Sequence, residues 1–201
     1  MNIAITGTSS GIGQELSKKL SNDHTIISIS RDVLELSDLD KVNDYIVPNV
    51  DMLINCAGTD LGGKIEFTQH DSQSVVNILT TNLLAPVLLS QKTLTANLNC
   101  KIVNITSTNN KRYWPHNLAY SLSKQSLSTF GSMLQIEYPS INYLEVQLGL
   151  TKTNFNNNRY VGYKERFNDV YVNPHLTVEQ AVEKILNVLF DNKIKFIEIS
   201  P

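Results

Sequence analysis

The apolar residues of this 201-residue chain fall into two alternating kinds of segment. Short, nearly continuous apolar runs are typical of strands buried in a parallel sheet, and they occur at residues 3–5, 24–30, 33–36, 51–55, 101–107, 142–148 and 195–199. Between them, apolar residues recur every three or four positions, which predicts amphipathic helices at residues 12–20, 37–45, 71–98 (bent at Pro86), 117–137 and 178–190. Because strands alternate with helices and no linker or repeat intervenes, we expect one α/β domain over residues 1–201, built on a doubly wound parallel sheet.

Four polar or glycine-containing segments stand where predicted strands end: TGTSSGIG at 6–13, NCAG at 55–58, ITS at 105–107 and LGLTKT at 148–153. The carboxyl ends of the strands of an open α/β sheet meet at one edge, and ligands bind there. We therefore expect the functional site at this edge.

The first of these segments packs Gly7, Gly11 and Gly13 into a strand-to-helix turn. Glycines let the backbone approach a ligand closely, and the first amides of the following helix favour an anion such as a phosphate. A tight turn without a ligand would need only one glycine, so the pattern favours phosphate binding. A nucleoside-triphosphate loop requires Gly-Lys-Ser/Thr, whereas Gln14 follows Gly13, and the common Gly-x-Gly-x-x-Gly spacing is not matched either.

Composition and charge argue against several other classes. The 17 Lys and Arg residues are scattered and the formal net charge is −2, which gives no electrostatic footprint for nucleic acid or for an anionic membrane. The N-terminus enters a strand directly, so we expect no signal peptide, and no apolar run reaches the ~18–20 residues of a membrane span. Cys56 and Cys100 lie in or beside apolar strands without metal-type spacing. This predicts buried thiols, no metal site and a cytoplasmic protein.

Three motifs in this order resemble the short-chain dehydrogenases/reductases. The turn at 6–13 matches the Thr-Gly-x-x-x-Gly-x-Gly cofactor loop of that family completely. NCAG at 55–58 is similar to the family's Asn-Asn-Ala-Gly, and YSLSK at 120–124 resembles its catalytic Tyr-x-x-x-Lys. The resemblance spans residues 3 to about 153 and implies a Rossmann-like fold.

A second tyrosine–lysine pair, Tyr160 and Lys164, has the same spacing as Tyr120 and Lys124. Context separates the two pairs, because Tyr120 stands thirteen residues after Ser107, which is the family's serine-to-tyrosine interval. No such serine precedes Tyr160. We therefore interpret Tyr120 and Lys124 as the active pair.

The resemblance implies a role for each catalytic residue. Tyr120 exchanges a proton with the substrate oxygen, and the Lys124 cation favours the phenolate and holds the nicotinamide ribose. Ser107 hydrogen-bonds the same substrate oxygen. Asn82 occupies the position of the family's fourth catalytic residue, which holds a water that links the lysine to solvent.

The resemblance also implies a nicotinamide dinucleotide, with these contacts: Gly7, Thr8, Ser9, Gly11, Ile12, Gly13, Arg31, Asn55, Ala57, Gly58, Tyr120, Lys124 and Thr153. Thr153 keeps its place although Leu148 replaces the proline that usually begins its loop. An acidic residue at the end of the second strand holds the 2′-hydroxyl of NAD. Here neutral Ser30 is followed by Arg31, whose planar fork suits a phosphate. We expect NADP, with NAD as the alternative if Asp32 turns into the pocket.

Two departures from the family pattern affect the expected architecture. Only Arg31 and Asp32 connect the second predicted strand to the run at 33–36, so we expect the helix between strands two and three to be absent. The sequence ends at Ser200-Pro201 without the family's glycine-rich tail. We expect a homodimer through the helices at 71–98 and 117–137, and the missing tail leaves the family's tetramer uncertain.

The leading functional prediction is an NAD(P)-dependent oxidoreductase that acts on a small carbonyl compound or secondary alcohol. Two alternatives remain open: a dinucleotide-binding sensor without turnover, and a dimerisation module, which would leave the glycine turn unexplained. Trp114, His116 and residues 155–171 are expected to surround the substrate, with 150–176 as a lid over the nicotinamide. The sequence does not identify the substrate.

Overall fold

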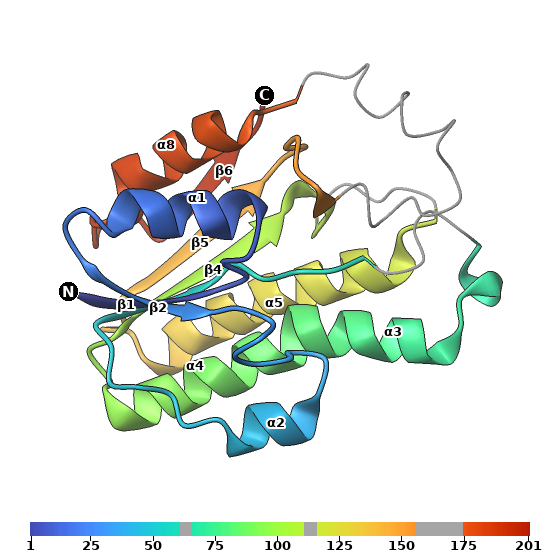
Figure 1. Cartoon of the computed structure of the whole chain (residues 1–201), viewed down its shortest axis with the longest axis horizontal. Helices are drawn as coiled ribbons and strands as arrows, with labels where there is room; N and C mark the ends of the chain where they lie inside the picture. The colour runs from blue at the N-terminus through green and yellow to red at the C-terminus, as the bar shows by residue number, and fades with distance from the viewer. Residues whose placement is uncertain (61–65, 111–115, 156–174) are drawn as a thin grey trace.

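The computed structural model describes residues 1–60, 66–110, 116–155 and 175–201. Within them, six strands form one parallel sheet in the order β2-β1-β3-β4-β5-β6, with helices on both faces (Figure 1). The strands are β1 Asn2–Thr6, β2 Thr25–Ile29, β3 Met52–Asn55, β4 Lys101–Ser107, β5 Tyr143–Leu148 and β6 Phe196–Ile199. The helices are α1 Gly11–Leu20, α2 Leu39–Asp44, α3 Ser72–Leu79, α4 Ala85–Ala96, α5 Leu118–Glu137 and α8 Val178–Leu189. The shorter helical turns are η1 Phe67–Gln69, η2 Thr80–Leu84 and η3 Thr108–Asn110. The predicted doubly wound α/β fold is confirmed.

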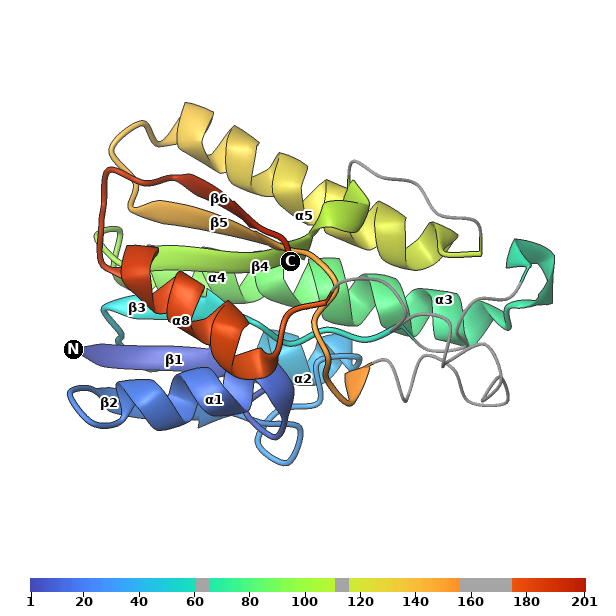
Figure 2. The ribbon, with the colours of Figure 1, turned by 90° about the horizontal axis from the view of Figure 1, so that it is seen from above.

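Alternate residues of the strands face two separate apolar cores, as the twofold period of a strand requires. Ile3 and Ile5 of β1 belong to the core that α1 and α8 cover, whereas Ala4 belongs to the core that α4 and α5 cover. Figure 2 shows α1 and α8 in front of the strands, and Figure 1 shows α3, α4 and α5 beneath them. The sheet is therefore a buried central layer whose carboxyl edge is free to carry a site.

The predicted strand at 33–36 is wrong. The carbonyl oxygen of Ser30 accepts hydrogen bonds from the N–H groups of Val33 and Leu34 at 3.0 and 2.9 Å, so the backbone turns after β2 instead of extending. Leu34 and Leu36 are buried in the core beside α4, which explains their apolar spacing without a strand. No helix lies between β2 and the run at 33–36, as predicted. Helix α2 corresponds to the helix predicted at 37–45, and because the run at 33–36 forms no strand, the next strand after it is β3.

The helix predicted at 37–45 forms as α2, with Asp38 rather than Ser37 as its N-cap residue. The side chain of Asp38 accepts a hydrogen bond from the N–H of Lys41 at 3.1 Å, which caps the helix. Ser37 instead donates from its N–H and its hydroxyl to Glu35 Oε1, at 3.1 and 2.8 Å. These bonds fix the turn that follows β2.

The long predicted helix at 71–98 forms with an irregularity just before Pro86. It runs as α3, the π-helical turn η2 and α4, and the N–H of Ala85 bonds to the carbonyl oxygen of Thr80, five residues back. Proline lacks the N–H of a regular turn and its ring crowds the preceding turn. The wide turn accommodates that crowding, and it places Asn82 on the inner side of the helix, where it is fully buried.

This composite helix, Ser72–Ala96, is also the one described helix that is long and apolar enough to cross a membrane, with a mean hydropathy of 1.3. That test rests on length and composition alone. Ile78, Ala85 and Leu89 are fully buried, as expected for a helix that packs on a sheet. The sequence prediction that no apolar run is long enough to span a membrane therefore does not hold for this helix, by length and composition alone.

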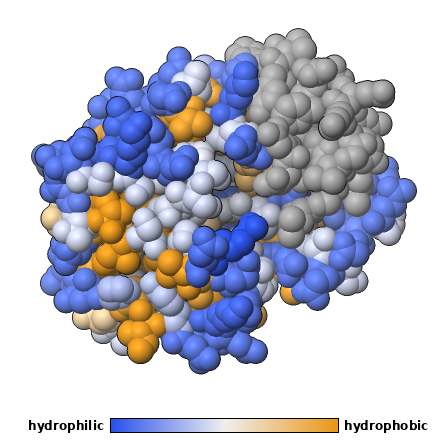
Figure 3. All heavy atoms as spheres, in the orientation of Figure 1, coloured by the Kyte–Doolittle hydropathy of each residue, from blue (hydrophilic) through white to orange (hydrophobic). Residues whose placement is uncertain are grey.

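Strand β2 forms one edge of the sheet. Exposed apolar side chains lie in the turns and the helix that follow it, including Val33, Leu39 and Ile46, the last 88% exposed. Figure 3 shows apolar side chains gathered in the lower left of the face, on the side of β2 and α2. Among the described residues, no further strand pairs with the outer side of β2, and a turn follows it instead.

Candidate active site

The glycine turn between β1 and α1 requires glycine for steric reasons. Gly7 and Gly11 have φ angles of +75° and +57°, a region that side chains rarely adopt. A Cβ on Gly7 would lie 2.8 Å from Cα of Ala57, and one on Gly13 would collide with the carbonyl oxygen of Gly7. The turn is thus pressed against the NCAG segment. Thr6 strengthens this contact, because its hydroxyl oxygen accepts hydrogen bonds from the N–H groups of Cys56 and Ala57 at 2.9 and 3.0 Å.

The N-terminus of α1 is uncapped. Its N-cap residue, Ser10, makes no side-chain cap bond, and the first turn holds no acidic residue. The positive end of the helix is therefore available to an anion. Ile12 packs into the core beneath the turn and offers only its backbone, whereas Thr8 is half-buried and Ser9 exposed.

Thr153 lies against this turn, as the sequence predicts. Its methyl group is 3.5 Å from the position that a Cβ of Gly11 would take. Its hydroxyl oxygen accepts a hydrogen bond from the N–H of Phe155 at 3.3 Å. The segment after β5 and the segment after β1 therefore meet at the carboxyl edge of the sheet.

Lys124 is a buried cation beside the NCAG segment. Its Nζ donates a hydrogen bond to the carbonyl oxygen of Ile105 at 3.0 Å, and its residue is 5% exposed. A Cβ on Gly58 would lie 3.5 Å from this Nζ. Burial disfavours the ammonium form and lowers the pKa of Lys124 to about 8. Burial also raises the pKa of the nearby Cys56 thiol to about 12, so that thiol is uncharged near neutral pH.

Asn82 connects η2 to two other parts of the site. Its Oδ1 accepts a hydrogen bond from the N–H of Thr59, and its Nδ2 donates to the carbonyl oxygen of Thr59, both at 2.8 Å. The same Nδ2 donates to the hydroxyl oxygen of Ser123 at 3.1 Å, and that hydroxyl donates to the carbonyl oxygen of Tyr120 at 2.7 Å. Asn82 thus ties the loop after β3 to the first turns of α5.

Ser107 and Tyr120 occupy the same edge of the sheet. Ser107 is the last residue of β4, and its hydroxyl oxygen accepts a hydrogen bond from the N–H of Asn109 at 3.2 Å. Tyr120 is in the first turn of α5, one helical turn before Lys124, and is 8% exposed. Its ring lies 5.7 Å from that of Phe155, at an interplanar angle of 55°.

Asn55 and Arg31 have different surroundings. The buried Nδ2 of Asn55 donates to Asn104 Oδ1 at 2.9 Å and to Ser90 at 3.1 Å, so this side chain joins β3, β4 and α4. Arg31 follows β2 by two residues and its side chain is 80% exposed, with Nε 3.5 Å from Oε2 of Glu35. The N–H of Gly7 donates to the carbonyl oxygen of Ile29 at 3.1 Å, which places the end of β2 beside the glycine turn.

Comparison with known proteins identifies the family. A sequence model of the short chain dehydrogenases matches residues 22–163. The chain belongs to the short-chain dehydrogenase family. The match contains the NCAG segment, Ser107 and the Tyr120–Lys124 pair, and it begins after the glycine turn.

Several individual proteins are similar to this short-chain dehydrogenase. An NADP-dependent 3-hydroxy acid dehydrogenase of Schizosaccharomyces pombe is 27% identical, over 93% of this chain and 86% of that protein. A 3-ketodihydrosphingosine reductase of Bacteroides thetaiotaomicron is 27% identical, over 90% of this chain and 76% of that protein. Among solved structures, a 4-hydroxyisoleucine dehydrogenase complexed with NADH has a TM-score of 0.86 at 20% identity, covering 99% of this chain and 96% of that one. A serine dehydrogenase complexed with NADP⁺ has a TM-score of 0.82 at 20% identity, covering 100% and 95%.

Three residues outside the predicted site hold the short-chain dehydrogenase site together: Thr6, Thr59 and Ser123. Thr6 begins the glycine motif and Ser123 lies inside the Tyr-x-x-x-Lys motif, so their positions offered a signal. Thr59 acts through its backbone, for which no side-chain pattern exists.

Two predicted parts of the substrate region, Trp114 and positions 156–174 of the lid, lie outside the described residues, and so does the rejected pair Tyr160 and Lys164. The two ends of the lid segment are described. The N–H of Lys152 donates to the carbonyl oxygen of Leu176, and the N–H of Leu176 donates to that of Leu150, both at 2.9 Å. His116 has a φ of 62° and lies 3.7 Å from a carboxylate oxygen of Glu66.

Proposed function

We propose that this short-chain dehydrogenase transfers hydride between NADP(H) and a small carbonyl compound or secondary alcohol, with Tyr120 as the proton donor and acceptor. The observation that carries the proposal is the buried Lys124, one helical turn after Tyr120 and beside Gly58. A buried ammonium is costly, and it is retained where a function needs it.

The residues at the carboxyl edge fit a dinucleotide. The glycine turn forms a cradle that side chains would fill, and the uncapped α1 offers amides to a pyrophosphate. Thr153 borders the same turn, where it would contact the carboxamide or a phosphate. Lys124 would hold the ribose hydroxyls from the opposite side of NCAG.

When bound, the dinucleotide would supply hydride to the carbonyl carbon, or accept it in the reverse direction. Tyr120 would donate its phenolic proton to the carbonyl oxygen and recover it in oxidation. The Lys124 cation would favour the phenolate that remains, and Ser107 would hydrogen-bond the substrate oxygen. The side chain of Asn82 is used by Thr59 and Ser123, so we assign it the positioning of this loop, and the water of the family stays a prediction.

The preference for NADP rests on Arg31. Its Nε faces Glu35, and the side chain is otherwise open to solvent beside the end of β2. The terminal nitrogens are free to form a bidentate contact with a 2′-phosphate. The yeast relative is named as NADP-dependent, which agrees with this preference.

Turnover assays with a matched pair of variants test the proposal. Oxidation of NADPH is followed over a panel of 3-oxo acids, long-chain ketones and simple aldehydes, chosen to include the chemistry named for the relatives. Tyr120→Phe should lower kcat by at least about a hundredfold and leave NADPH affinity nearly unchanged, because the phenol serves proton transfer. Tyr160→Phe, in the second Tyr-x-x-x-Lys pair, should keep the native rate. Near-native turnover by Tyr120→Phe would show the site assignment to be wrong, and NADPH binding without any turnover would favour the sensor.

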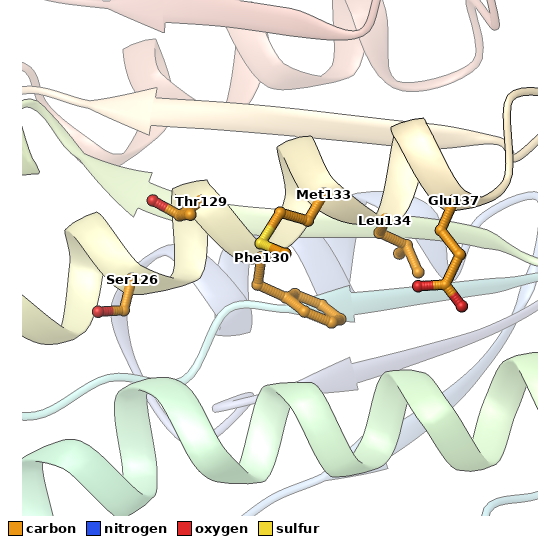
Figure 4. Close-up of a pocket in the computed structure, with 6 residues that line it drawn as sticks. All are labelled: Ser126, Thr129, Phe130, Met133, Leu134 and Glu137. Carbon is orange, nitrogen blue, oxygen red and sulfur yellow. The ribbon is translucent and has the colours of Figure 1, made fainter.

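We further propose a homodimer through α5 and the composite helix at Ser72–Ala96. Met133 and Ile136 of α5 are 63% and 79% exposed. A hollow of about 380 Å³ runs along one side of α5 (Figure 4), lined by Ser126, Thr129, Phe130, Met133, Leu134 and Glu137. Apolar side chains spaced three and four residues apart present a stripe that a second copy of the same helix fits.

A further inference from the structure

Asn117 carries a buried amide three residues before the proposed catalytic tyrosine. It precedes α5 as its N-cap residue and is 3% exposed. Neither its Nδ2 nor its Oδ1 makes a hydrogen bond within the part of the chain that the structure describes. Burying an unbonded amide is unfavourable, and buried polar side chains are bonded in the large majority of cases. A ligand that bonds this amide explains why the position retains it.

The helix places Asn117 on the catalytic face of α5. Positions 117, 120 and 124 are three and seven residues apart, so they share one side of the helix. Side chains of a helix tilt toward its N-terminus, which brings the Tyr120 ring back over the turn that Asn117 begins. Ser121, the next residue along this side, also has a buried hydroxyl that finds no hydrogen-bond partner among the described residues.

The start of α5 differs from the other helix starts away from the active-site edge. Asp38, Asp71 and Thr177 each cap their helix with a side-chain hydrogen bond. Asn117 belongs to a residue type that caps well, yet its side chain leaves the amides of α5 uncapped. The first turn of α5 carries no acidic residue either, so its positive end is not neutralised within the helix.

We propose that Asn117 binds the carboxylate of an oxo acid or hydroxy acid substrate, with its Nδ2 donating to a carboxylate oxygen while Tyr120 serves the carbonyl oxygen of the same molecule. The positive end of α5 favours the anion, and the amide fixes its position. This assignment rests on the proposed oxidoreductase function and adds the substrate class.

Kinetics on an acid and its ester test the assignment. The KM of Asn117→Leu for 3-oxobutanoate should rise by about tenfold to a hundredfold, the effect of losing a hydrogen bond to a charged group. The KM for methyl 3-oxobutanoate and for NADPH should stay near the native values. The melting temperature should stay the same or rise, because leucine removes an unbonded polar group at similar volume. Asn117→Asp should raise the KM for the acid further, because its carboxylate repels that of the substrate, and should leave the KM for the ester unchanged.

The same substitution at Asn187, exposed on α8 on the opposite face of the sheet, is the matched control and should change none of these quantities. If Asn117→Leu raises the KM for the acid and for the ester equally, or if its melting temperature clearly drops, the assignment is overturned, because either result indicates a structural role. Calorimetric binding of 3-oxobutanoate to the NADP⁺-loaded protein needs no turnover. One outcome would separate the two proposals: the native protein binds the acid, Asn117→Leu does not, and no substrate is turned over. In that case the oxidoreductase proposal fails and the carboxylate site stands. If the native protein does not bind the acid, the carboxylate site is overturned.

Discussion

Replacing Lys124 with methionine should stabilise the ligand-free protein while it abolishes turnover. The pKa of Lys124 is lowered by burial from its ordinary 10.5 to about 8. That difference makes the buried ammonium about 3 kcal/mol unfavourable at pH 7. Methionine has a similar length and no charge, but its introduction leaves the carbonyl oxygen of Ile105 without its partner, at a cost of about 1 kcal/mol. We therefore expect a net gain of about 2 kcal/mol in the free energy of unfolding at pH 7.

The pH dependence gives this prediction a sign. The folded pKa is lower than the unfolded one, so between about pH 8 and 10.5 the unfolded chain binds more protons at this position. The native protein should gain stability relative to Lys124→Met as the pH rises through that window, until the advantage of the variant disappears. Urea denaturation followed by circular dichroism at several pH values measures this difference, in which the other titrating groups cancel. Lys18→Met, at an exposed position of α1, should give no such trend. A variant that is less stable than the native protein at pH 7, or a difference independent of pH, would refute the reasoning.

Two further predictions concern the cofactor and the assembly. Arg31→Ala should weaken NADPH binding by roughly 1.5–3 kcal/mol, the value of a charge-assisted hydrogen bond, and leave NADH binding almost unchanged; equal losses measured by fluorescence titration would contradict the NADP preference. Met133→Glu replaces an exposed apolar side chain of the hollow along α5 with a second carboxylate near Glu137, and should convert a homodimer into a monomer at micromolar concentration, as measured by light scattering. A native protein that is already monomeric under those conditions would contradict the dimer.

The sequence predicted most of the strands and helices, and the failure at 33–36 shows the limit of pattern reasoning. The run VLEL at 33–36 is as apolar as a short buried strand, and Leu34 and Leu36 are buried. The backbone bonds that decide the conformation run from Val33 and Leu34 to Ser30, and they leave no trace in hydrophobic spacing. Burial of alternate side chains is therefore compatible with a turn that packs against a core.

Much of the candidate site could be predicted because its chemistry resides in side chains at strand and helix ends. Residue types at fixed spacings are enough to identify the glycine turn, Ser107 and the Tyr120–Lys124 pair. The hydrogen bonds of Asn82 to Thr59 and Ser123 depend on the π-helical turn η2, which precedes Pro86 and which no residue pattern predicts. The unpartnered state of Asn117 is likewise a property of packing.

The turn that stands where a strand was predicted after β2 also carries Arg31, the residue proposed to select the cofactor. Ser107, Tyr120 and Lys124 are buried residues of β4 and α5, at the face where this helix packs on the sheet. Arg31 instead lies in the exposed turn after β2, which is held by hydrogen bonds from the N–H groups of Val33 and Leu34 to the carbonyl oxygen of Ser30. A turn tolerates substitution far better than a central strand, because fewer backbone bonds and core contacts depend on it. Under the proposed function, a substitution at Arg31 should therefore change the cofactor preference without disturbing the proposed proton transfer, whereas a substitution at Lys124 should alter stability and turnover together.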